Sequence, residues 1–151
     1  MAFDRQIIEA QLALDMIEST DMPKIAWDAL KAGLGGKFIR RLGALDSPTY
    51  FQVTEVLPQA MQEMGLSKPS RGEAALRLAK ARAKEILDSN DDPLKHTKDF
   101  ERLWIDADYP KELMSVGNLD DEVYIMSGNK SDDAIRKWIL DQLRNFIHDE
   151  T

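Results

Sequence analysis

The spacing of apolar residues is the feature that most constrains the fold of this chain. Apolar side chains recur every three or four residues through most of the 151 positions, which is the period of an amphipathic α-helix. Residues 49–56 are the one segment that also favours a strand, but their helical spacing continues through Met64. The clearest register belongs to the segment 132–148, through Ile135, Trp138, Ile139, Leu143, Phe146 and Ile147. The pattern therefore predicts an all-α protein.

Prolines, glycines and capping residues divide this pattern into about six to seven helices. The first is expected over residues 3–19, and others are expected to end at Gly33 and Gly65. Pro58 is expected to end or kink its helix near Leu57. A single helix is predicted over 93–105, followed by irregular structure over 106–118. We predict an irregular multi-helix bundle, with stacked antiparallel helix pairs as the alternative.

Length and composition bound the class of protein. The chain fits a single domain over 1–151, with a change in charge near residues 88–93, in the segment DSNDDP. It has no cysteine, which excludes disulfides, thiolate nucleophiles and thiolate metal sites. Asp4, Arg5 and Glu9 argue against a secretory signal, and no apolar run approaches the roughly 20 residues that span a bilayer. We expect a cytoplasmic protein with no membrane contact.

Negative charge is concentrated in the last part of the chain. Residues 1–90 contain 12 basic and 12 acidic residues, whereas residues 91–151 contain 8 basic and 15 acidic residues, a net charge of −7. Such a surface repels nucleic acid and anionic membranes and attracts basic proteins. Carboxylates beside an aromatic residue in an irregular segment suit the centre of an interface. The predicted protein-interaction residues are Asp106, Asp108, Tyr109, Asp120, Asp121 and Glu122.

Catalytic and metal-binding patterns are weak. His96 and Asp99 are three residues apart on a predicted helix, but a structural metal site needs about four ligands. Clustered carboxylates can hold Mg²⁺ or transfer protons, although solvated loops and helix N-termini explain them more simply. We therefore predict no catalytic residue, metal or cofactor. A metal-assisted hydrolase that uses the carboxylates, and a nucleic-acid binder that uses the basic helix 71–84, remain as alternatives.

One stretch of sequence is similar to a known layout. It comprises the helix end Ala26-Trp27-Asp28-Ala29-Leu30-Lys31-Ala32-Gly33, the turn Phe38-Ile39-Arg40-Arg41-Leu42-Gly43-Ala44-Leu45 and the helix end Ala60-Met61-Gln62-Glu63-Met64-Gly65-Leu66. Over about residues 25–90 this resembles small uncharacterised bacterial all-helical proteins. The resemblance implies a bacterial helical protein and carries no activity.

The charge pattern and the lack of a catalytic constellation together predict a function. We expect a protein-binding module of a bacterial cell, an immunity- or antitoxin-like inhibitor or an adaptor, whose acidic C-terminal surface meets a partner with a basic surface. The identity of the partner, the biological process and the oligomeric state are left open by the sequence.

Overall fold

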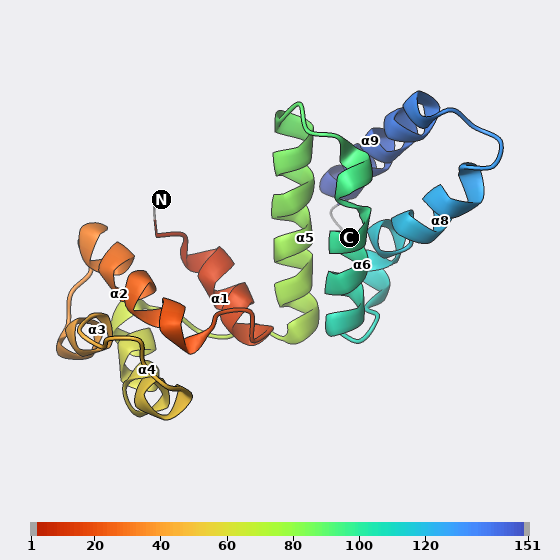
Figure 1. Cartoon of the computed structure of the whole chain (residues 1–151). Coiled ribbons are helices and arrows are strands. Elements are labelled where there is room, and N and C mark those ends of the chain that lie inside the picture. The colour runs from red at the N-terminus through yellow and green to blue at the C-terminus, as the bar shows by residue number, and fades with distance from the viewer. Residues whose placement is uncertain (1–2, 150–151) are drawn as a thin grey trace. The chain divides into compact units, whose positions relative to one another are not determined.

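The computed structural model describes residues 3–149 and confirms the all-α prediction. Helices make up 73% of the structure, and the described residues contain no strand (Figure 1). Between residues 3 and 149 there are nine α-helical segments, close to the six or seven predicted, and the shortest is a single turn. The chain divides into two compact units, Met1–Ser70 and Arg71–Thr151, and the single domain expected over 1–151 stays a prediction. The change in charge near 88–93 falls within the second unit.

The first unit consists of four helices around one apolar core. They are α1 (Arg5–Ala13), α2 (Met22–Lys31), α3 (Lys37–Gly43) and α4 (Tyr50–Met64). The core includes Leu12, Ala26, Ile39, Leu42, Val53, Val56, Ala60 and Met64. The expected helix 3–19 is shorter, because Asp15 adopts a left-handed backbone conformation with φ of 55° directly after the C-cap. As predicted, Gly65 ends α4, with a φ of 71° that favours glycine.

The prediction that Pro58 ends or kinks α4 near Leu57 was wrong for the end of the helix, which continues to Met64. Proline removes one hydrogen bond, to the carbonyl four residues earlier, which belongs to Thr54. Both Thr54 and Pro58 are exposed, so water can take the place of the missing donor. A capping box formed by Thr49 and Gln52 also fixes the start of this helix.

Two carboxylates hold the first unit together from within. One oxygen of Glu63, on α4, accepts hydrogen bonds from the backbone N–H groups of Phe38 and Ile39, each 2.8 Å long, at the start of α3. A Cβ atom at Gly36 would overlap that carboxyl group, so a larger residue there would have to displace it. The buried Glu9 accepts a 2.7 Å hydrogen bond from the backbone N–H of Ser67. Charge thus serves local structure in this unit.

The second unit contains five helices. They are α5 (Arg71–Asp88), α6 (Thr97–Asp106), α7 (Met114–Gly117), α8 (Leu119–Met126) and α9 (Asp132–His148). The single helix predicted over 93–105 was wrong, because Pro93–Lys95 forms a 3₁₀ turn before α6. The fully buried Ala75, Ala79 and Ala83 form the core face of α5, which contacts α6 and α9. Their small side chains allow helix axes to approach closely.

Basic residues of α5 are engaged with the ends of two other helices. The Arg71 guanidinium donates a 2.8 Å hydrogen bond to the carbonyl of Asp106, the last residue of α6. The Lys80 ammonium donates one of 2.8 Å to the carbonyl of Asp149, which follows α9, and lies 5.5 Å from the centre of the Phe146 ring. Cations at helix C-termini satisfy free carbonyls and oppose the negative end of the helix dipole. The basic helix therefore contributes to packing within its own unit.

Among residues 3–149, no helix is both long enough and apolar enough to span a membrane.

Candidate functional site

Two of the predicted interaction residues line one groove, which we call the acidic groove. It has a volume of about 600 Å³, includes Asp106 at the end of α6 and Asp120 at the start of α8, and is also lined by Lys98, Asp99, Glu101, Arg102 and Ile105. One carboxylate oxygen from each of Glu101, Asp120 and Asp121 lies within 4.8 Å of the others. The structure thus brings together Asp106, Asp120 and Asp121, and adds Glu101 to them.

The local structure of α8 explains why three acidic residues occur in a row. Asp120, Asp121 and Glu122 occupy the first turn of the helix, where the positive end of the dipole stabilises negative charge. Asp120 also accepts a 2.8 Å hydrogen bond from the hydroxyl of the buried Thr97, the first residue of α6. Asp120 therefore joins the starts of two helices, whereas Asp121 and Glu122 are exposed.

Asp108 and Tyr109 lie in the turn that follows α6. Both adopt left-handed backbone conformations, with φ of 65° and 58°. The Tyr109 N–H donates a 2.8 Å hydrogen bond to the carbonyl of Trp104, and the two rings meet edge to face at 5.1 Å between centroids. The Trp104 indole N–H in turn donates to the carbonyl of Pro110 at 3.0 Å. The turn is held by its own aromatic pair, and Tyr109 is only partly free to contact a partner.

Glu122 lines a second groove, away from the first set of residues. This groove of about 710 Å³ also includes Lys80, Lys111, Glu112, Met114 and Phe146. Its lining includes two basic residues, Lys80 and Lys111, and three acidic ones, Glu112, Glu122 and Asp149, so it has no strong net charge. Of the six predicted residues, Asp106 and Asp120 therefore line the acidic groove, Glu122 lines the second groove, Asp108 and Tyr109 lie in the turn, and Asp121 lies beside Asp120 and Glu101. Their joint role in an interface stays a prediction.

Two groups of carboxylates in the second unit differ in their electrostatic surroundings. In the group on α5, α9 and the segment between α5 and α6, Glu73, Glu85, Asp92, Asp133 and Asp141 each pair with an arginine. The second group lies in the chain segment from α6 to α8. Within residues 3–149, its members form no ion pair shorter than 4.0 Å; they are Glu101, Asp106, Asp108, Glu112, Asp120, Asp121 and Glu122. We call these seven residues the unpaired carboxylates.

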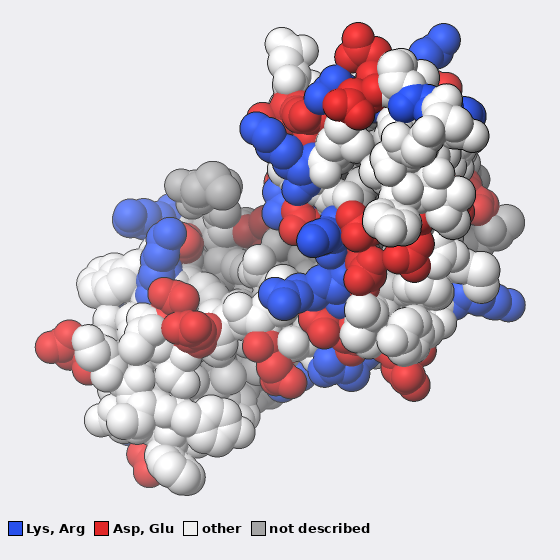
Figure 2. All heavy atoms as spheres, turned by 45° about the vertical axis from the view of Figure 1, so that its right-hand side comes forward, with Lys and Arg blue, Asp and Glu red and all other residues white. Residues whose placement is uncertain are grey.

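The unpaired carboxylates account for the charge of their unit. Residues 97–126 contain 8 acidic and 3 basic residues, a net charge of −5, and the whole unit 71–151 has the same net charge, from 18 acidic and 13 basic residues. On the face of this unit that Figure 2 presents, acidic side chains gather in patches with basic side chains at their edges. The excess charge of the second unit is therefore local to α6, α7 and α8.

The paired group includes Asp92, whose pKa is shifted in the folded protein. A side-chain hydrogen bond of 3.0 Å from Arg136 lowers the pKa of Asp92 below its ordinary value, and burial opposes this effect. The N–H of Leu94 lowers it further, because Asp92 also caps the 3₁₀ turn. His96 lies 3.6 Å from Asp91 and 3.4 Å from Asp99, and no histidine joins the Glu101 group.

Glu101 is the residue of this site that the sequence did not indicate. It lies one turn after Thr97, so it shares the face of α6 that contacts Asp120. The spacing of four residues was visible in the sequence, but the contact between α6 and α8 was not. The exposed carboxylates can attract cationic side chains or a divalent cation. Comparisons of the chain with protein-family models, curated proteins and solved structures found no match, so no relative supplies a function for these residues.

Proposed function

We propose that this protein is a protein-binding module whose second unit recognises a partner with a basic surface. The observation that carries the proposal is the set of seven unpaired carboxylates between α6 and α8, in a unit whose other acidic residues mostly have cationic partners. Unpaired charges of one sign cost stability in the free protein and gain favourable contacts when an opposite surface arrives. In a bacterial cell this chemistry fits an immunity- or antitoxin-like inhibitor, or an adaptor.

Charge also supports this choice over a nucleic-acid binder. Arg71, Lys80 and Arg82 of α5 contact groups of their own unit, which reduces the basic surface available to phosphates. No aromatic residue occurs in 71–84 on which a base could stack. Retention on immobilised DNA at low salt, lost at high salt, would favour the nucleic-acid alternative instead.

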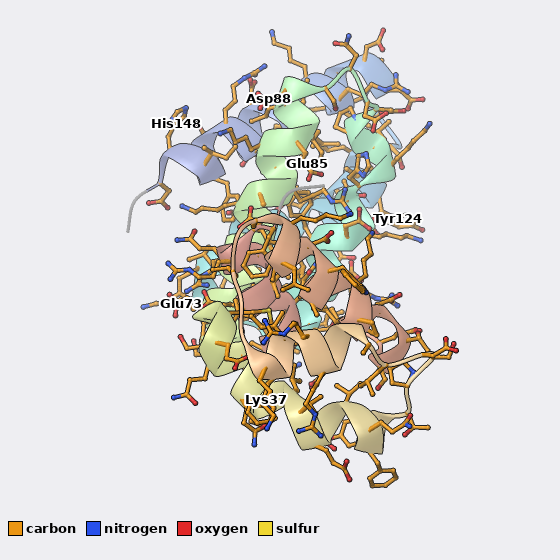
Figure 3. All side chains as sticks on the ribbon, turned by 90° about the vertical axis from the view of Figure 1, so that its left-hand side faces the viewer. Lys37, Glu73, Glu85, Asp88, Tyr124 and His148 are labelled. Carbon is orange, nitrogen blue, oxygen red and sulfur yellow. The ribbon has the colours of Figure 1, made fainter. Side chains whose placement is uncertain are left out.

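A direct test uses a labelled, unstructured peptide of alternating lysine and glycine as the basic probe. The test variant is Glu101→Gln/Asp106→Asn/Asp121→Asn, which keeps Asp120 because of its hydrogen bond to Thr97. The control variant is Glu85→Gln/Asp88→Asn/Asp141→Asn, which removes the same three charges from α5 and α9; Glu85 and Asp88 are labelled in Figure 3. Fluorescence anisotropy at low ionic strength measures the dissociation constant of each protein.

We expect the test variant to bind the peptide about tenfold more weakly than the native protein, and the control variant to stay within about twofold of it. Equal weakening of both variants would show that only net charge matters, and would contradict a localised binding surface. Failure of the native protein to bind the peptide at all would also contradict the proposal.

The metal-assisted hydrolase alternative has one observation in its favour, the approach of Glu101, Asp120 and Asp121 to within 4.8 Å. Thermal unfolding with Mg²⁺, Mn²⁺, Ca²⁺ or Zn²⁺ separates it from protein binding. A cation present at 100 times its dissociation constant would stabilise the native protein by about 2.7 kcal/mol and would not stabilise the test variant. Protein binding alone predicts no such difference.

A further inference from the structure

The helix α8 exposes two large apolar side chains side by side. Tyr124 is 83% exposed and Ile125 is 74% exposed, and Leu119 is the one residue of α8 that is fully buried. Figure 3 shows Tyr124 at the outer edge of the second unit. Single apolar residues are common on protein surfaces, but two large neighbours on a short helix form a patch that water solvates poorly.

Acidic residues surround this patch. Asp121 lies three and four residues before Tyr124 and Ile125, so all three share one face of the helix, and Glu122 lies three residues before Ile125. Asp121 and Glu122 both belong to the unpaired carboxylates. Figure 1 shows an extended connection between α8 and α9, so the C-terminal end of α8 is followed by loop rather than by another helix. The outward face of α8 is therefore both apolar and anionic.

Charge decides which kind of molecule can cover this face. A second copy of the chain, packed by two-fold symmetry, would bring Asp121 and Glu122 of one copy toward the same residues of the other. Nucleic acid and anionic membranes carry the same sign of charge and would be repelled. A protein segment with apolar side chains on one stripe and lysine or arginine beside them matches both properties.

We propose that the outward face of α8 docks a basic amphipathic helix of a partner protein. Tyr124 and Ile125 contact the apolar stripe of that helix, and Asp121 and Glu122 pair with its cationic side chains. This inference rests on the proposed function for the sign of the partner's charge, and adds the form of the partner segment. Amphipathic helices dock through apolar anchors spaced by three and four residues, and the exposed neighbours Tyr124 and Ile125 offer such anchors an apolar contact surface.

The two kinds of contact have separable effects on binding. Charge pairs at an exposed rim mainly raise the association rate, whereas buried aromatic and aliphatic anchors mainly slow dissociation. Loss of Tyr124 and Ile125 is therefore expected to accelerate dissociation with little change in association. Loss of Asp121 is expected to slow association, and the effect is expected to shrink at high salt.

The test compares two peptides of equal positive charge on the whole chain. One is an amphipathic helical peptide of leucine and lysine, and the other is the unstructured lysine–glycine peptide. The test variant is Tyr124→Ser/Ile125→Ser. The control variant is Tyr50→Ser/Phe51→Ser, which removes an apolar pair from α4 that is similarly exposed, at 68% and 77%, and has no three consecutive acidic residues beside it. Helical circular dichroism confirms that each variant folds.

We expect the native protein and the α4 control to bind the leucine–lysine peptide about tenfold more tightly than the lysine–glycine peptide, and the α8 variant to lose that advantage. Equal binding of both peptides by the native protein, with no effect of the α8 variant, would overturn this inference and leave the proposed function intact. Equal losses in both variants would indicate non-specific apolar contact and would also overturn it. Self-association of the native protein that the α8 variant abolishes would identify a second copy as the occupant instead.

Discussion

The two units of this protein use carboxylates in opposite ways. In the first unit, Glu9 and Glu63 accept backbone hydrogen bonds from segments distant in sequence, at 2.7 and 2.8 Å. In the second unit, the seven unpaired carboxylates gather between α6 and α8, and of these Asp120 alone accepts a side-chain hydrogen bond that ties two helices together. Much of the surface of the first unit that Figure 2 presents is uncharged, whereas that of the second is densely charged. Glu9 and Glu63 therefore serve folding in the first unit, whereas most of the unpaired carboxylates of the second unit make no such structural contact among residues 3–149.

If carboxylates of the first unit serve folding, the largest loss of stability should follow replacement of Glu63. Replacing Glu63 by alanine leaves the N–H groups of Phe38 and Ile39 without their charged acceptor, which should cost about 2–4 kcal/mol. Glu55→Ala is the matched control, because Glu55 is exposed on the same helix and should cost less than about 0.5 kcal/mol. Urea unfolding measures both values.

Hydrogen exchange locates the Glu63 effect within the chain. In Glu63→Ala the amides of α3 should lose protection, while the amides of α5 should keep it, because α5 belongs to the other unit. Equal costs for Glu63→Ala and Glu55→Ala would show that the carboxylates of the first unit do not serve folding, and the contrast between the units would fail.

Local signals in the sequence predicted much of the fold. Serine is among the residues that favour helix N-caps, and the hydroxyl of Ser131, directly before the predicted helix 132–148, accepts a hydrogen bond from the N–H of Ala134 at 3.2 Å. Gly33 and Gly65 were predicted to end helices, and both adopt positive φ values, 92° and 71°, that residues other than glycine rarely adopt. These features depend on a few neighbouring residues, so the sequence alone suffices to identify them.

Features that depend on distant contacts were not predictable in this way. Turns without glycine were equally hard to identify, because Asp15, Asp108 and Tyr109 adopt positive φ values that residues other than glycine rarely adopt. The hydrogen bonds of Glu63 link residues 24 and 25 positions apart. At the candidate site, the approach of Glu101 to Asp120 depends on how α6 packs against α8, which the charge pattern does not encode.

In the second unit we expect a smaller change in the free energy of unfolding, and of opposite sign. Glu101→Gln removes repulsion among three close carboxylates, so it should raise the free energy of unfolding by a few tenths of a kcal/mol at low salt. Glu85→Gln removes a carboxylate that pairs with Arg82 and should lower it slightly. Urea midpoints at low and high salt measure these changes. Destabilisation by Glu101→Gln would mean that Glu101 serves folding after all.

The smallest expected effect is a dependence of stability on pH at Asp92, one of the paired carboxylates. The pKa of Asp92 is lowered in the folded protein, first by its hydrogen bond from Arg136, so the folded state releases this proton more readily than the unfolded state. The stabilisation is therefore fully present above the ordinary value of 3.8 and is lost as pH falls through the lower, folded value. Asp92→Asn should be less stable than the native protein at neutral pH, and the difference should close in acid.

Asp133→Asn is the control, because Asp133 pairs with the same arginine from an almost fully exposed position and should change stability less. The contrary result is a stability difference between Asp92→Asn and the native protein that stays constant from pH 7 to below 3.8. It would show that the charge of Asp92 contributes no stability through Arg136, so paired and unpaired carboxylates would not differ in energy.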